Sequence, residues 1–75
     1  MEQKTIIFTH ASGIKSYDFP SNELNEVIRI LDKCLKGDLH ALTHFEKDGS
    51  DTYYPASYLQ NSHIEIKDKV IPKIM

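Results

Sequence analysis

The chain has 75 residues, a formal net charge of −2 from nine basic and eleven acidic residues, and 40% hydrophobic residues. This composition is ordinary for a folded globular domain and argues against disorder. With no excess of basic residues, no global field attracts the chain to nucleic acid or to anionic lipid, and the single cysteine excludes an intramolecular disulfide.

Length and the start of the chain indicate one small cytoplasmic domain over residues 1–75. A chain this short buries roughly 60% of the surface that its unfolded form exposes, so its stability is expected to be marginal and a second copy is one candidate partner. Only three consecutive apolar residues, 6–8, follow the polar start, too few for a signal peptide or a membrane span. One thiol also fits a reducing compartment. We therefore expect a cytoplasmic protein without a membrane partner.

The first elements along the chain are predicted to be two strands of a hairpin. Residues 4–10 are rich in β-branched and aromatic side chains, and residues 14–19 alternate between two faces of a strand. Residues 11–13 form the expected turn between them. Because Thr5 to Thr9 contains no proline or charge, we expect this stretch to be a weakly protected edge of the sheet.

Residues 21–37 are predicted to form the main helix, with Ser21 or Asn22 capping its start and Gly37 its end. Its hydrophobic residues recur with the 3.6-residue period of a one-sided helix. They are Leu24, Val27, Ile28, Leu31, Cys34 and Leu35. This hydrophobic stripe requires a sheet to cover it.

A third strand is predicted over residues 38–46, and its inner face is expected to carry alternate residues from position 39 onward. These inner residues are Leu39, Ala41, Thr43 and Phe45, whereas His40, Leu42, His44 and Glu46 are expected outside.

The clearest turn is the Asp-Gly pair that joins the third and fourth strands. A two-residue loop would pair Glu46 with Asp51 and turn Tyr54 inward. A three-residue loop would pair Glu46 with Ser50 and turn Tyr53 inward. We favour the second register because the first sets two like charges opposite each other.

The rest of the chain adds one short turn and one more strand. Pro55 ends or edges the fourth strand, and residues 56–61 are predicted to make one irregular or helical turn with Leu59 in the core. Residues 63–67 alternate again, with Ile64 and Ile66 inward, and residues 68–75 are an edge strand or a tail. The order β-β-α-β-β-β predicts a single small α+β domain, an antiparallel sheet with one amphipathic helix packed on one face.

No catalytic, cofactor or metal site is predicted, and we do not expect an enzyme. His40 and His44 share a strand face, but two residues four apart on a strand have Cα atoms about 13 Å apart, too far for one zinc ion. Cys34 lies on the hydrophobic stripe of the helix, where a buried thiol is inert. The three glycines are explained by turns or a helix end and form no phosphate-binding loop.

The least ordinary feature is a cluster of tyrosines, Tyr53, Tyr54 and Tyr58, beside the Asp-Gly turn. Neighbouring residues on a strand point to opposite faces, so one of Tyr53 and Tyr54 must lie outside. Exposed tyrosines are favoured at protein interfaces. The competing interpretation is that the tyrosines only cover the sheet of a small domain.

We therefore expect a small non-enzymatic interaction or regulatory module that binds a protein, either a second copy or another chain, through an edge strand and the tyrosine cluster. The alternative is a single-stranded nucleic-acid binder whose outer tyrosines stack on bases. Glu46, Asp48 and Asp51 near the tyrosines count against it. The general make-up is similar to that of many small bacterial and phage proteins, and this resemblance implies no site.

Overall fold

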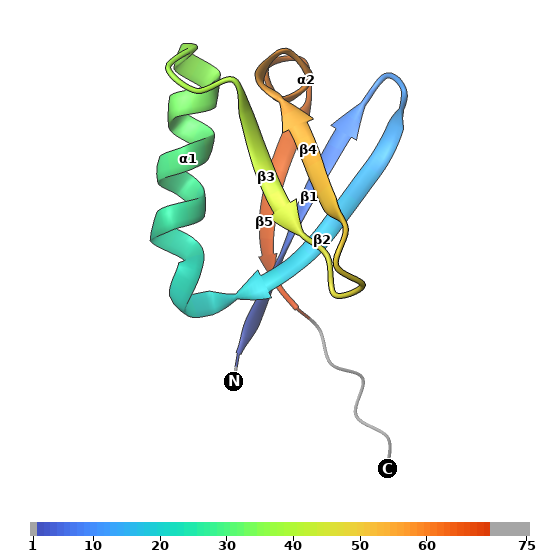
Figure 1. Ribbon diagram of the computed structural model, residues 1–75, viewed down its shortest axis with the longest axis vertical. Coiled ribbons are helices and arrows are strands. Elements are labelled where there is room, and N and C mark those ends of the chain that lie inside the picture. The colour runs from blue at the N-terminus through green and yellow to red at the C-terminus, as the bar shows by residue number, and fades with distance from the viewer. Residues whose placement is uncertain (1, 70–75) are drawn as a thin grey trace.

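The computed structural model describes residues 2–69 and contains two antiparallel sheets and one long helix (Figure 1). The large sheet has the strand order β2-β1-β5, and the small sheet pairs β3 with β4. The elements in chain order are β1 (Gln3–His10), β2 (Gly13–Pro20), the 3-10 turn η1 (Ser21–Glu23), α1 (Leu24–Lys36), β3 (Ala41–Phe45), β4 (Asp51–Pro55), the short helix α2 (Ala56–Gln60) and β5 (His63–Asp68). The predicted single α+β domain is confirmed.

The strands form two sheets and not the single predicted sheet, because the β3–β4 hairpin does not pair with an edge of the large sheet. It lies across the inner face of that sheet, beside α1 (Figure 1). The aromatic ring of Tyr54 on β4 lies 4.7 Å from that of Phe8 on β1. The predicted helical turn after Pro55 is confirmed as α2, and Leu59 on it is fully buried. Of the predicted edge strand or tail at 68–75, Asp68 ends β5, and residues 70–75 lie outside the described residues.

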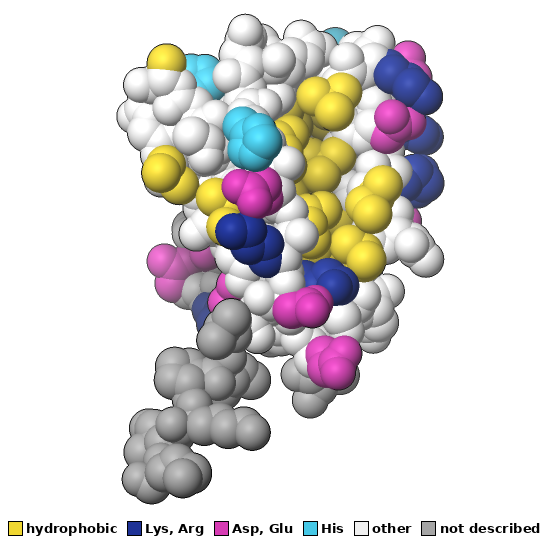
Figure 2. All heavy atoms as spheres, turned by 180° about the vertical axis from the view of Figure 1, so that it is seen from behind, with side chains coloured by type: hydrophobic (Ala, Val, Ile, Leu, Met, Phe, Trp, Pro, Cys, Tyr) yellow, Lys and Arg dark blue, Asp and Glu magenta, His cyan; other side chains and the backbone are white. Residues whose placement is uncertain are grey.

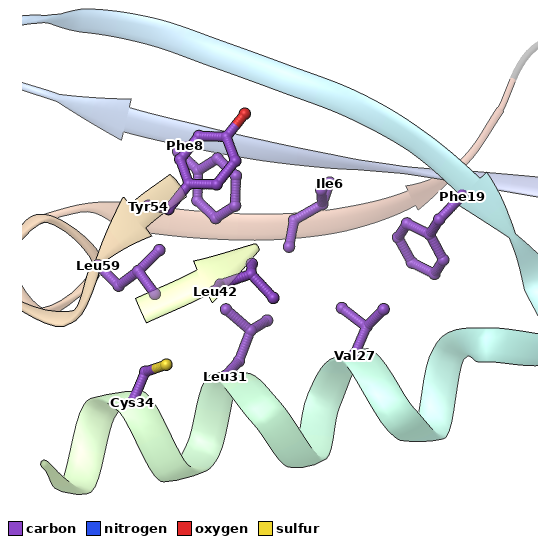
Figure 3. Packing of buried hydrophobic residues seen from close by; sticks show 9 residues of the cluster. All are labelled: Ile6, Phe8, Phe19, Val27, Leu31, Cys34, Leu42, Tyr54 and Leu59. Carbon is purple, nitrogen blue, oxygen red and sulfur yellow. The ribbon is translucent and has the colours of Figure 1, made fainter. Parts of the chain in front are cut away.

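The hydrophobic core is enclosed between the two sheets and α1 (Figure 3). The large sheet contributes alternate residues of its strands, as expected for a sheet with one buried face. The buried residues are Ile6, Phe8, Phe19, Val27, Leu31, Cys34, Leu42, Tyr54 and Leu59. Ile64 and Ile66 on β5 pack against this cluster and are half-buried, so their predicted inward direction is confirmed.

The helix α1 packs through one side of its hydrophobic stripe, where Val27, Leu31 and Cys34 are buried. Its end is as predicted, because Gly37 adopts φ 86° and its N–H donates to the Cys34 carbonyl at 3.1 Å. The predicted side-chain cap at its start is wrong. The N–H of Ser21 instead donates to the Glu2 carbonyl at 3.1 Å, which continues the β1–β2 ladder into the turn before the helix.

The third strand begins three residues later than predicted, because the helix end uses the preceding backbone. The N–H of Asp38 donates to the Lys33 carbonyl at 2.8 Å, so this residue still belongs to the helix terminus. The favoured register of the next hairpin is confirmed, since the Glu46 N–H donates to the Ser50 carbonyl at 2.8 Å.

The predicted faces of this hairpin are wrong. Leu42 and Tyr54 stand opposite each other and are buried, with 3% and 5% of their surface exposed. Phe45 and Tyr53 point outward, with 75% and 63% exposed. Leu39 lies before the strand, so Leu42 is the largest aliphatic residue of β3. When Leu42 faces the core, the residues on either side of it in the alternation, including Phe45, must face outward.

The predicted edge strand Thr5 to Thr9 is also wrong, because β1 is the central strand of the large sheet. A stretch without proline or charge suits that position, where both sides of the backbone are paired. The edges are β2 and β5, and Pro20 lies at the end of the edge strand β2.

We predict that Leu31→Ala destabilises the protein by about 2 to 4 kcal/mol, because the buried side chain leaves a cavity between α1 and the sheets. Unfolding in urea measures this change. The matched control is Ile14→Ala, since Ile14 is 71% exposed on β2 and its loss is expected to change stability by less than about 0.5 kcal/mol. Equal shifts for the two variants would contradict this account of the packing.

We predict that Cys34 reacts much more slowly with a thiol reagent in the folded protein than in urea. The side chain is fully buried, and burial raises the pKa of its thiol, so the reactive thiolate is both shielded and scarce. Labelling followed by mass spectrometry measures the two rates. Similar rates in the folded and unfolded protein would show that the core opens readily at the end of α1.

Candidate interaction surfaces

The outer face of the small sheet carries two exposed aromatic rings. Phe45 stands opposite Asp51 and Tyr53 opposite Thr43, so the two rings are diagonal neighbours on one side of the β3–β4 ladder. We name this surface the aromatic face and define it as Thr43, Phe45, Tyr53 and Pro55. Its backbone is held in place because the alternate residues of the same strands, Leu42 and Tyr54, belong to the core.

The structure does not bring the three predicted tyrosines onto one surface. Tyr53 is exposed on the aromatic face, whereas Tyr54 is buried against Phe8. Tyr58 lies on α2, is half-buried, and stacks on the ring of His10 with 4.7 Å between the ring centroids. Tyr54 and Tyr58 thus pack among other aromatic rings, and Tyr53 alone of the three offers most of its side chain to a partner.

Sequence reasoning missed Phe45 as a surface residue. The signal that could have identified it is the strand period, because Phe45 and Leu42 are three residues apart and therefore cannot share a strand face. A hairpin that buries Leu42 must expose Phe45. A hairpin that buries Leu42 and one that buries Phe45 differ only in which face of the hairpin meets the large sheet.

A wide surface cleft of about 870 Å³ lies between β2 and the turn that joins β3 to β4. In its wall the Tyr17 ring stacks on His44 with 3.9 Å between centroids, and His44 Nε2 lies 3.7 Å from a carboxylate oxygen of Glu46. The Thr52 hydroxyl donates to the same carboxylate at 3.0 Å. His44 is therefore turned toward the large sheet and not outward as predicted.

Two titratable groups of the cleft have shifted pKa values. Burial, helped by the nearby Tyr54 and Glu23, raises the pKa of Tyr17 to about 12, which keeps its phenol neutral and unsuited to act as a base at neutral pH. On the rim, hydrogen bonds from Lys69 and Thr5 lower the pKa of Asp18, so its carboxylate is held charged in an ion pair. Within residues 2–69, no group of three or more His, Cys, Asp or Glu side chains is arranged to hold a metal ion.

Comparisons with family models, with curated proteins and with solved structures found no match to this chain. Across the described part of the chain, none of the helices has both the length and the apolar character needed to cross a membrane.

We predict that the stability of the fold decreases as the pH rises from 10 toward 12, and that Tyr17→Phe makes this decrease smaller. The pKa of Tyr17 is raised from 10.0 to about 12 in the folded chain. Its contribution to the free energy of unfolding is therefore complete below pH 10. That contribution is lost as the pH rises toward 12, because the Tyr17 phenol loses its proton more readily in the unfolded chain. Urea unfolding of both proteins across this range measures the effect. Tyr54, whose pKa burial also raises, accounts for part of the slope that remains. Equal slopes in the two proteins would contradict the burial of the Tyr17 phenol.

Proposed function

We propose that this protein is a small non-enzymatic interaction module that acts in the cytoplasm by binding another protein through its aromatic face. The observation that carries the proposal is the exposure of Phe45 and Tyr53, 75% and 63%, as neighbours on one face of a hairpin. A few residues carry most of the binding energy at protein interfaces, and aromatic residues are enriched in the buried centre of such interfaces.

Support for binding comes from the rigidity of the aromatic face. The core holds the strands through Leu42 and Tyr54, so the backbone that carries Phe45 and Tyr53 is already ordered when a partner covers them. A polar residue stands beside each ring, since Asp51 is opposite Phe45 and Thr43 is opposite Tyr53. Hydrophobic residues inside a polar rim are the usual anatomy of a protein interface.

The same surface suits single-stranded nucleic acid less well, although exposed rings can stack on bases. The rings lie near carboxylates, with Asp51 directly across the ladder from Phe45. Hydrogen bonds from Ser50 lower the pKa of Asp48 in the adjoining turn, which keeps a further negative charge close by. A phosphate backbone lying over the rings would meet these charges, and the chain carries a net charge of −2.

We predict that the double variant Phe45→Ser/Tyr53→Ser recovers at least about tenfold less of its protein partner than the wild type, as expected when two interface anchors are lost. Affinity capture from a host lysate identifies the partner, and titration with the purified partner then measures the affinity. Circular dichroism checks that the variant remains folded.

The matched control is Ile14→Ser, which removes an equally exposed hydrophobic residue from the large sheet and is expected to bind like the wild type. Equal partner binding by all three proteins would overturn the proposal. Micromolar, salt-sensitive binding of a short single-stranded oligonucleotide that disappears in the double variant would replace it with the nucleic-acid alternative.

A further inference from the structure

The outer edge of β5 is open for strand pairing. The N–H of Lys69 donates to the opposite carbonyl of Gln3 at 3.0 Å, and hydrogen bonding in an antiparallel ladder alternates along the strand. The odd-numbered residues of β5 therefore bond to β1, and the backbone groups of Ile64, Ile66 and Asp68 point away from it. Among residues 2–69 these three have no strand beside them, because β5 is paired only with β1.

Hydrophobic side chains lie beside this edge. Figure 2 shows them as a continuous strip on the face behind the small sheet, with charged side chains on either side. On α1, Ile28 and Leu35 are 49% and 46% exposed and Leu24 is half-buried. On β5, Ile64 and Ile66 are half-buried and pack against the core. An open edge next to an exposed hydrophobic strip provides both backbone and side-chain contacts for a strand.

The other edge of the large sheet is interrupted by a proline at one end. By the same alternation, since the Ser21 N–H donates to the Glu2 carbonyl, the even-numbered residues of β2 face outward. One of them is Pro20, which has no N–H to donate, and it lies at the end of this edge. Incoming strands are therefore expected at β5 and not at β2.

We propose that β5 binds the β5 strand of a second copy of this chain, antiparallel and about a two-fold axis, so that two large sheets join into one. The proposal goes beyond the proposed function, because it concerns a different surface. The small sheet with its aromatic face lies on the opposite side of the molecule from this strip (Figures 1 and 2), so each copy in the dimer keeps that face available.

The alternation of hydrogen bonds limits how two β5 strands can align. Only outward-facing residues can exchange backbone hydrogen bonds, so even-numbered residues must stand opposite even-numbered ones. Two alignments keep the same length of paired strand within His63–Asp68. One centres on Ile66 and sets Glu65 opposite Lys67 of the partner, twice by symmetry. The other centres on Glu65 and sets it opposite its own copy.

Charge selects the alignment centred on Ile66. Glu65 and Lys67 lie on the exposed face of β5, and in this alignment they occupy the positions without hydrogen bonds, where side chains across the ladder are closest. Both Glu65–Lys67 pairs are then attractive, the two Ile66 side chains meet beside the hydrophobic strip, and Ile64 stands opposite Asp68 of the partner. The competing alignment brings two Ile64–Ile66 pairs together but places two carboxylates opposite each other at its centre. Lys67, which would otherwise repel an incoming strand, gains a specific partner.

Disulfide cross-linking tests the alignment directly. In an antiparallel pair, residues opposite each other without hydrogen bonds have Cα atoms about 4.5 Å apart, within the range that a disulfide spans, whereas diagonal neighbours are about 7 to 8 Å apart. We expect Glu65→Cys and Lys67→Cys proteins to form a mixed disulfide dimer when combined under mild oxidation. Either protein alone is expected to remain uncross-linked, and the fully buried Cys34 does not interfere.

Charge reversal gives an independent measurement by analytical ultracentrifugation. Glu65→Lys sets two basic residues opposite each other at both pairs and is expected to raise the dimer dissociation constant by about tenfold or more. The double variant Glu65→Lys/Lys67→Glu exchanges the two charges and is expected to restore the wild-type constant. Tyr53→Ser, on the aromatic face, is the control that leaves dimerisation unchanged.

A monomeric wild type at all accessible concentrations would overturn the proposal, and so would a dimer in which Glu65→Cys cross-links to itself or no cross-link forms. These outcomes are distinct from failure of the proposed function. If the wild type is monomeric and Phe45→Ser/Tyr53→Ser still weakens partner binding, the proposed function stands and the dimer does not. If the dimer cross-links as expected but those substitutions leave partner binding unchanged, the dimer stands and the proposed function does not.

Discussion

The contact between Phe8 and Tyr54 joins the two sheets, and the arrangement of the whole molecule depends on it. Phe8 is the largest fully buried side chain among the described residues and belongs to the central strand of the large sheet. Its ring lies 4.7 Å from that of Tyr54 and 6.1 Å from that of Tyr58, so β4 and α2 both meet β1 at this point. A small domain without an internal disulfide depends on its packed core for stability, and aromatic side chains bury large areas there.

This contact also decides which residues the protein offers to its surroundings. Because Tyr54 is drawn into the core, its neighbour Tyr53 must point outward, and Leu42 across the ladder turns Phe45 outward in the same way. The aromatic face is thus the necessary counterpart of the core. Tyr53 is positioned by the buried Tyr54 next to it, and Phe45 follows the half-buried His44, so a small fold can present an ordered surface.

The division into two sheets has a second consequence at the edges. Had the β3–β4 hairpin extended the large sheet, one of its strands would have covered an edge. Because it packs on the inner face instead, β5 remains an outer strand, and one flank of α1 stays exposed at Ile28 and Leu35. The hydrophobic stripe of α1 is wider than the area that the two sheets cover, which explains why its predicted members divide into buried and exposed groups.

The sequence by itself determined the local features. The 3.6-residue period located α1 and its buried Leu31, Gly37 marked its end, and the Asp-Gly turn with its like-charge argument indicated the correct pairing of Glu46 with Ser50. These features depend on residues close in the chain, whose geometry and charge act at short range.

Only the tertiary structure decided which face of that hairpin is buried, which strand of the sheet is central, and hence which tyrosine is exposed. The two faces of a strand differ by one residue of offset, so either face of β3 is possible until another element covers it. Thr5 to Thr9 has the same composition whether one side or both sides of its backbone are paired. Its position became defined when β5, more than fifty residues later, paired with it, and such long-range partners leave no local pattern in the sequence.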